Sequence, residues 1–210
     1  MSSLSKTLSG SGNRKKFTIS VWIKRTFFGS SGFIFGVGTA STDTGKFSLF
    51  FTTQDRLLVE GGATTFKQTS RRYTDPSAWY HIVVAVDTTL ATQNDRIKIY
   101  TNGVLETDFE SNSGPSQDLN GPVNENGKLQ YIGLSGAAGN SFKGYMAHYH
   151  HIDGTQYAAS DFGQTDSTTQ SWIPISQPNV NYGTHGFFFK FEDASNMGLD
   201  SSGQSNNYSV

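Results

Sequence analysis

The sequence contains no cysteine and only 5 proline residues among 210. A chain without cysteine is not a disulfide scaffold, and it is compatible with a reducing cytoplasm. Apolar stretches long enough to span a bilayer are also missing, and the first ten residues lack the apolar core of a secretory leader. We therefore expect a soluble protein that folds inside a cell and does not insert into a membrane.

The chain also has little net charge. It carries 16 basic and 17 acidic residues, which gives a formal charge of -1 with neutral histidines. Proteins that bind nucleic acids through electrostatics usually present a clear basic excess. The composition therefore argues against a nucleic-acid partner, and binding is expected to depend on neutral or local features.

Sustained helical periodicity is missing as well, whereas strand patterns are frequent. Short runs that alternate in hydropathy, separated by turns rich in Gly, Ser, Thr and Asn, are typical of β-sandwiches. Strands are expected at residues 17–25, 33–38, 47–52, 56–60, 66–72, 82–86, 96–100, 104–110, 128–134 and 142–154. We predict one all-β domain over residues 1–210, a two-sheet antiparallel β-sandwich in jelly-roll order. Residues 1–16 would form a polar amino-terminal arm, and residues 195–210 a carboxy-terminal tail.

The stretch from Trp79 to Gly103 organises this pattern. Its first run, residues 82–86, is continuous and β-branched, which indicates a strand buried on both faces. In the second run Ile97 and Ile99 alternate with polar residues, and Asn-Gly ends it with a strong turn signal. The order Trp-Tyr-His, apolar run, Asp, polar loop, Arg-Ile-Lys-Ile-Tyr-Thr-Asn-Gly resembles the central signature of laminin G-like domains in the concanavalin A-like lectin/glucanase superfamily. The resemblance implies a sandwich fold.

Motifs in the last third of the chain point to a narrower group within this superfamily. They are Asp153-Gly154, Asp161-Phe162-Gly163, Trp172-Ile173-Pro174, a Gly-Thr-His-Gly-Phe run that starts at Gly183, and a Leu-Asp-Ser-Ser-Gly run that starts at Leu199. In this order they resemble the version of the domain found in structural proteins of tailed bacteriophages, especially those of marine bacteria. Such phage domains usually belong to longer chains. The resemblance implies a virion protein.

A carboxylate triplet is the clearest enzymatic candidate. Glu106, Asp108 and Glu110 would share one face of a strand, because side chains alternate along a strand. Glu-x-Asp-x-Glu resembles the catalytic strand of laminarinase-type β-glucanases, which implies Glu106 as nucleophile, Asp108 as helper and Glu110 as acid/base. The alternative, which we favour, is three solvated acids on an exposed edge that leads into a loop.

Histidines provide a candidate metal site. His148 and His150 are expected on one face of their strand, and two neutral imidazoles at this spacing could bind zinc, nickel or iron. Only Asp153 lies nearby as a further ligand, so we favour ordinary half-buried histidines, no metal and no cofactor. His81 is expected to be structural. The sequence also lacks a serine nucleophile motif and a Gly-rich phosphate loop.

Aromatic residues are abundant, with 16 Phe and 9 Tyr. Exposed rings often contact sugars, so Tyr73, Tyr131 and Tyr149 are candidate carbohydrate platforms, although most rings should fill the sandwich. Trp22 lies opposite the apolar face of its strand and is expected to be covered.

These observations favour a non-enzymatic bacteriophage virion protein exposed on the capsid or tail. It would be made in the host cytoplasm, act as a decoration, fibre or glycan-contacting module, and contact other virion proteins and a host surface glycan. A homo-oligomer, most simply a trimer, is expected to dock through residues 1–16, 111–127 and 203–210. The alternatives are a β-glucan hydrolase that uses the carboxylate triplet, and a free carbohydrate-binding lectin.

Overall fold

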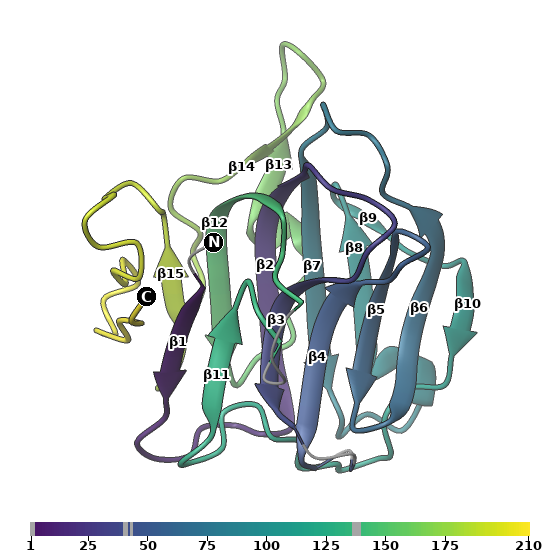
Figure 1. Cartoon of the computed structure of the whole chain (residues 1–210), viewed down its shortest axis with the longest axis vertical. Coiled ribbons are helices and arrows are strands. Elements are labelled where there is room, and N and C mark those ends of the chain that lie inside the picture. The colour runs from purple at the N-terminus through teal and green to yellow at the C-terminus, as the bar shows by residue number, and fades with distance from the viewer. Residues whose placement is uncertain (1–2, 40–41, 43, 136–139) are drawn as a thin grey trace.

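The protein is a sandwich of two antiparallel sheets. The computed structural model describes residues 3–39, 42, 44–135 and 140–210. A seven-stranded and a six-stranded sheet pack face to face, and a small two-stranded sheet projects beyond them (Figure 1). Helical structure in the described residues is confined to two short 3₁₀ turns, η1 (Gln93–Asp95) and η2 (Ala159–Asp161), and no helix there could cross a membrane. The predicted all-β sandwich is confirmed.

The strand order joins segments that are distant in the sequence. The seven-stranded sheet runs β1 (Leu4–Thr7), β11 (Leu129–Ile132), β3 (Gly32–Gly38), β4 (Lys46–Phe51), β5 (Arg56–Gly61), β6 (Thr64–Arg72) and β10 (Phe109–Asn112). The six-stranded sheet runs β15 (Phe187–Phe189), β12 (Gly144–Asp153), β2 (Lys16–Arg25), β7 (Tyr80–Asp87), β8 (Ile97–Thr101) and β9 (Val104–Leu105). β13 (Gly163–Thr165) and β14 (Trp172–Pro174) form the small sheet.

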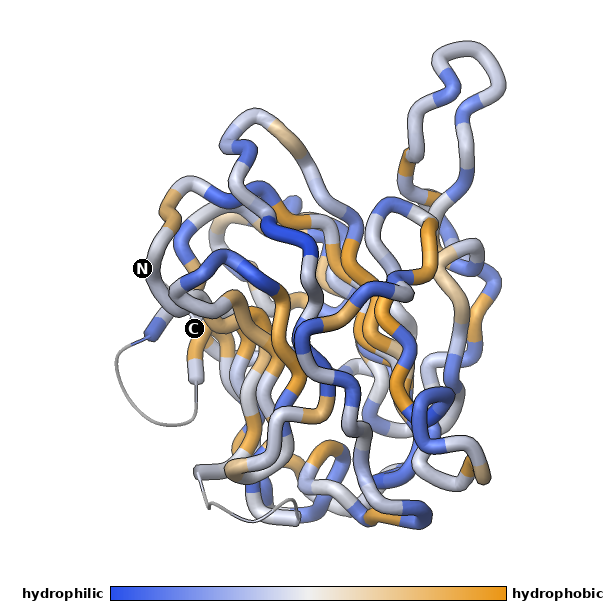
Figure 2. The backbone as a smooth tube through the Cα atoms, turned by 90° about the vertical axis from the view of Figure 1, so that its right-hand side faces the viewer, coloured by the Kyte–Doolittle hydropathy of each residue, from blue (hydrophilic) through white to orange (hydrophobic). Residues whose placement is uncertain are grey.

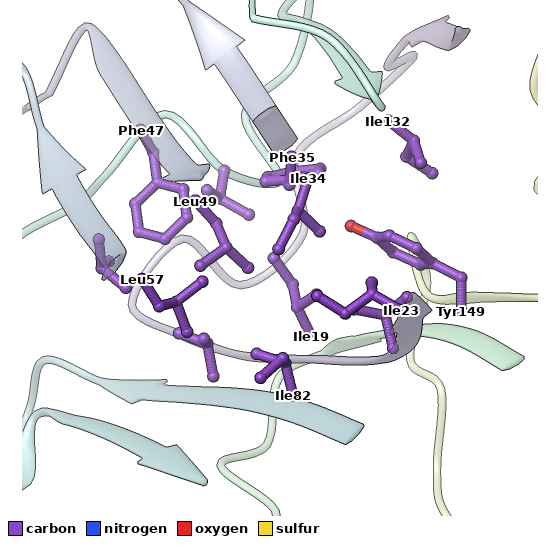
Figure 3. Packing of buried hydrophobic residues seen from close by; sticks show 14 of the residues in the cluster. Ile19, Ile23, Ile34, Phe35, Phe47, Leu49, Leu57, Ile82, Ile132 and Tyr149 are labelled. Carbon is purple, nitrogen blue, oxygen red and sulfur yellow. The ribbon is translucent and has the colours of Figure 1, made fainter. Parts of the chain in front are cut away.

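The core lies between the two large sheets. Alternate apolar side chains of β2, β7 and β8 point into it and are at most 3% exposed: Ile19, Val21, Val84, Val86, Ile97 and Ile99. Close up, Ile19 and Ile82 of the six-stranded sheet lie opposite Leu49 of the seven-stranded sheet (Figure 3). Burial of β-branched and aromatic side chains on both inner faces provides most of the stabilisation of such a sandwich. The predicted strand faces are therefore correct.

β7 is buried on both faces, as its continuous apolar run predicts. Val84 points into the core, whereas Val83 belongs to a second apolar cluster on the outer face of the six-stranded sheet. In β8 only alternate residues are buried, and Asn102 and Gly103 have positive φ angles of 49° and 83° in the turn to β9. Asn102 also accepts a hydrogen bond from the His81 backbone N–H over 2.7 Å. Both parts of the central signature therefore have their predicted structures.

β6 is more buried than its polar sequence predicts. Phe66, Lys67 and Thr69 are less than 5% exposed. The reason is the sheet order, because β10 pairs with β6 and takes the edge position. β6 is therefore an interior strand, although its mostly polar sequence would suit an exposed one.

The segments predicted to be an arm and a tail are integrated into the sandwich. Leu4–Thr7 is strand β1 and pairs with β11, and Ser5 exchanges two backbone hydrogen bonds with Ser209. Further along, the buried Asp153 carboxylate accepts hydrogen bonds from the Asn13 backbone over 2.7 Å and the Asn124 amide over 3.0 Å. The amino-terminal residues therefore have more strand pairing than the sequence predicts.

Candidate functional site

The carboxylate triplet does not lie on one strand. Val104–Leu105 belongs to the six-stranded sheet, and Phe109–Asn112 belongs to the seven-stranded sheet. The chain crosses from one sheet to the other between them, which interrupts the alternation on which the shared face depended. The prediction of one strand over residues 104–110 is therefore wrong, and strand alternation no longer places the three carboxylates on a common face.

Each carboxylate of the triplet has its own partner on β5 or β6. Glu106 accepts a hydrogen bond from Arg71 Nε over 2.7 Å, and Asp108 accepts one from Ser70 Oγ over 2.8 Å. Glu110 forms an ion pair with Arg56 over 2.5 Å. The three acids connect the crossing segment to the neighbouring strands.

His148 and His150 lie close together, but their surroundings differ. A bulge between Ala147 and His150 gives His148 a φ of 46°, and the two rings are 6.4 Å apart. His150 is buried, stacks on Phe188 at 4.0 Å, and its Nδ1 lies 2.9 Å from the Tyr182 hydroxyl. Burial lowers the pKa of both histidines. In the described part of the chain, no three His, Cys, Asp or Glu residues are placed to hold a metal ion.

Two of the three candidate tyrosine platforms are inside the protein. Tyr73 is fully buried, and its hydroxyl lies 2.8 Å from Thr101 Oγ1. Tyr149 is also fully buried, and Figure 3 shows its ring within the core. Neither ring can stack on a sugar, because both point between the sheets. Tyr131 is half-buried on β11 and keeps part of its ring accessible.

A stack of three rings is centred on His81, which is fully buried on the outer face of the six-stranded sheet. Trp22 pairs with His81 across β2 and β7 and stacks on it at 5.0 Å. The ring of Trp172 of β14 lies 6.1 Å away, and its indole N–H donates to His81 Nδ1 over 2.9 Å. Nδ1 must therefore be the unprotonated nitrogen, so Nε2–H donates to Ser20 Oγ over 2.8 Å. Burial lowers the pKa of His81 to about 3, which keeps the ring neutral.

The middle of this outer face is covered by the chain that follows β12. Phe162 and Tyr182 pack on Val83, Ile152 and Phe188 of the sheet, and Tyr157 and Trp172 pack around them. We call residues 156–182 the cover. Trp172 fits tightly within it, since a Cβ at Gly103 or Gly163 would lie 2.8 Å or 2.6 Å from its ring. Trp22 is half-buried beside the cover, so the prediction that it is covered is correct in part.

Three exposed aromatic side chains gather at one end of the six-stranded sheet. Phe27 is 48% exposed, Trp79 41% and Tyr145 61%, and no other large aromatic side chain in the described residues is as exposed. Phe27 follows the end of β2, Trp79 precedes β7, and Tyr145 is the second residue of β12. β2 is antiparallel to both β7 and β12, so these positions meet at the same end of the sheet. We call this surface the aromatic end.

The hairpin of β13 and β14 projects beyond this end of the sandwich. Figures 1 and 2 show it standing clear of the body, near the loop between β6 and β7, with a mostly polar tip. The tip is held by its own contacts, because Asp166 Oδ1 accepts hydrogen bonds from the Thr168 and Thr169 backbones over 3.1 and 2.7 Å. Trp172 fixes the base. The hairpin is therefore a pre-organised polar wall next to the aromatic end.

Comparison with protein families decides the classification. Residues 4–155 match the model of the Laminin_G_3 family, described as concanavalin A-like lectin/glucanases superfamily. The chain belongs to this superfamily. A search of curated proteins found no match.

Several solved structures are similar to this chain. The native heptameric SAP-like pentraxin of Limulus polyphemus is 16% identical, with a TM-score of 0.53 over 83% of this chain and 86% of that chain. The CBM40 of Ruminococcus gnavus IT-sialidase, bound to α2,6 sialyllactose, is 17% identical, with a TM-score of 0.44 over 75% of this chain and 93% of that one. Trypanosoma rangeli sialidase is 16% identical, with a TM-score of 0.46 over 70% of this chain and 22% of that chain. The pentraxin likeness supports the fold alone.

The superfamily match includes the aromatic end but not the cover. It ends at residue 155, before the cover begins, whereas Phe27, Trp79 and Tyr145 all lie inside it. The aromatic end thus belongs to the lectin-like sandwich, and the cover with its projecting hairpin is added to it. Sequence reasoning missed these three residues as a site because it could not tell which rings are exposed.

Proposed function

We propose that the protein is a non-enzymatic carbohydrate-contacting module of a bacteriophage virion, exposed on the capsid or tail. The observation that carries the carbohydrate part is the aromatic end, where Phe27, Trp79 and Tyr145 expose their rings on a lectin-like sandwich. Sugars present flat C–H faces that pack on aromatic rings, and their hydroxyl groups need polar partners at the rim. The tip of the projecting hairpin is rich in Ser, Thr and Gln, and the hairpin stands at this end of the sandwich (Figure 1), where such residues could serve as polar partners.

The cover favours the aromatic end as the glycan site and argues against the middle of the outer face of the six-stranded sheet. Phe162 and Tyr182 occupy the outer face above β2, β7 and β12, so a sugar could reach that face only by displacing them. The aromatic end needs no such displacement. The partners of Glu106 and Glu110 support the non-enzymatic part, because each carboxylate is already paired with an arginine, Arg71 or Arg56, whereas retaining hydrolysis needs two carboxyl groups free to act on a sugar between them.

Binding to a panel of immobilised glycans tests the carbohydrate part. The wild type should bind at least one glycan, and Trp79→Ala or Tyr145→Ala should weaken binding about fivefold or more, if stacking of a sugar on one ring contributes about 1–3 kcal/mol, as stacking of a nucleobase does. Tyr131→Ala is the matched control, because it removes a half-buried ring on β11 of the other sheet. Loss of binding in Tyr131→Ala alone would move the site to β11 and contradict the proposal.

The virion part is supported by the ordered motifs that resemble tailed-phage structural proteins. Mass spectrometry of purified particles should find the protein, and its absence from them would refute this role. A module that contacts glycans weakly gains from repetition, so we also propose a homo-oligomer, most simply a trimer. Light scattering of the isolated protein should report a mass above 22.9 kDa, and a strict monomer that also fails to contact other virion proteins would contradict this part.

A further inference from the structure

Lysine side chains are interleaved with the exposed rings. Lys24 of β2 pairs in register with Tyr145 of β12, on the outer face that alternates with the buried Ile23. On its other side, β7 begins with Tyr80 opposite Ile23, so the next position along places Trp79 beside Lys24. The strand register therefore places Lys24 between two residues, Tyr145 and Trp79, whose side chains are 61% and 41% exposed.

A second ammonium group lies at the third ring. Lys143 Nζ is 4.1 Å from the centre of the Phe27 ring, and the Lys143 carbonyl accepts a hydrogen bond from the Thr26 backbone over 3.1 Å. Neither Lys24 nor Lys143 forms an ion pair with a described residue.

One carboxylate acts on this cluster. Asp75 has an electrostatic interaction with Lys24, and its own oxygen is engaged by the Ser77 backbone and hydroxyl over 2.8 and 2.6 Å. Lys24 and Lys143 thus add two positively charged residues to the aromatic end, although the whole chain carries -1. Exposed rings together with basic side chains suit a ligand that combines flat apolar faces with negative charge.

We propose that the aromatic end binds an acidic polysaccharide, whose carboxylate or sulfate groups contact Lys24 and Lys143 directly while its sugar rings stack on Trp79 and Tyr145. This inference rests on the proposed carbohydrate function and adds the charge class of the ligand. An ammonium group is a compact donor that takes either anion without a fixed geometry, so the shared chemistry is negative charge. Direct lysine contacts need no bridging metal ion, and binding should therefore persist in EDTA.

Three polysaccharides distinguish the possibilities: alginate with carboxylates, κ-carrageenan with sulfates, and agarose as a neutral relative of carrageenan. The wild type in EDTA should bind at least one acidic polymer at least tenfold more tightly than agarose. Preference between alginate and carrageenan identifies the anion. Binding should weaken on raising NaCl from about 0.05 to 0.5 M, because the screening length falls well below about 10 Å.

Variants that remove one positive charge test whether Lys24 and Lys143 contact the acidic groups of the ligand. Lys24→Gln and Lys143→Gln should each reduce acidic binding roughly threefold, the range of a single exposed ion pair, and together about tenfold. Lys98→Gln is the control, since Lys98 lies on the same outer face in β8, away from the aromatic end, and should leave affinity unchanged.

The outcomes separate this inference from the function on which it rests. Equal binding to agarose and the acidic polymers, unaffected by the lysine variants but lost in Trp79→Ala, would overturn the acidic ligand and leave a neutral glycan site. Loss of acidic binding equally in Lys98→Gln would show attraction to general charge and overturn the assigned contacts. No binding to any glycan would overturn both proposals.

Discussion

Replacing Trp172 by Phe should destabilise the protein through one hydrogen bond. The indole N–H donates to His81 Nδ1 over 2.9 Å, and His81 is fully buried, so the variant leaves a buried acceptor without its donor. An unsatisfied buried group costs about 1–3 kcal/mol. For a chain of this length each kcal/mol lowers the melting temperature by about 2–4 °C, so a cost of about 2 kcal/mol, the middle of the range for such a group, should lower it by roughly 4–8 °C. Thermal unfolding followed by circular dichroism measures it.

Trp22→Phe is the matched control for this prediction. Trp22 stacks on the same imidazole at 5.0 Å and is also half-buried, but it contacts the imidazole through its ring alone. The Trp22→Phe substitution should therefore lower the free energy of unfolding by less than Trp172→Phe does. In addition, ¹⁵N NMR of the wild type should find the His81 proton on Nε2. Equal losses in the two variants, or a proton on Nδ1, would refute the reasoning.

Three further predictions concern the core, the carboxylates and pH. Ile99→Ala and Ile19→Ala should each lower the free energy of unfolding by about 2–5 kcal/mol, and unchanged melting temperatures would contradict the assigned strand faces. The wild type should release no reducing ends from laminarin, lichenan or agarose; release that disappears in both Glu106→Gln and Glu110→Gln would establish an enzyme. Burial lowers the pKa of His151 from 6.5 to about 3, so between these values only the unfolded state takes up the proton. Stability should fall below pH 6.5, by about 2 kcal/mol for this residue at pH 5, and urea unfolding of His151→Gln should show a correspondingly weaker pH dependence.

The sequence predicts those strands that can be identified from their own hydropathy pattern, without knowledge of their pairing partners. Alternation in residues 17–25 and the apolar run of residues 82–86 identify β2 and β7 because each face has a uniform environment along the strand. β1 and β15 have only four and three residues, and each depends on a distant partner, β11 and β12. The sequence does not predict the crossing at residues 106–108 for a related reason. Nothing in Glu-Thr-Asp indicates that the two ends of this segment belong to different sheets.

The candidate site was harder to predict than the fold. Its rings come from positions 27, 79 and 145, and only the antiparallel order of β2, β7 and β12 brings them to one end. Whether a ring faces water depends on the opposite sheet and on the cover, as the buried Tyr73 and Tyr149 demonstrate. One signal was present: Trp22 and Lys24 alternate with Ile23, which places them on the outer face.

The meeting of the two chain ends at β1 has a practical consequence. Because Ser5 and Ser209 bond to each other through their backbones, any sequence joined to either end must leave the molecule from the same edge (Figure 1). A short linker across this junction would allow new ends to be opened in an exposed loop elsewhere, such as the hairpin tip at residues 166–171. If the domain were attached to a larger assembly through the β1 edge, the two ends of the sandwich that carry the loops would remain accessible. The rings of Phe27, Trp79 and Tyr145 would then still be exposed to a ligand.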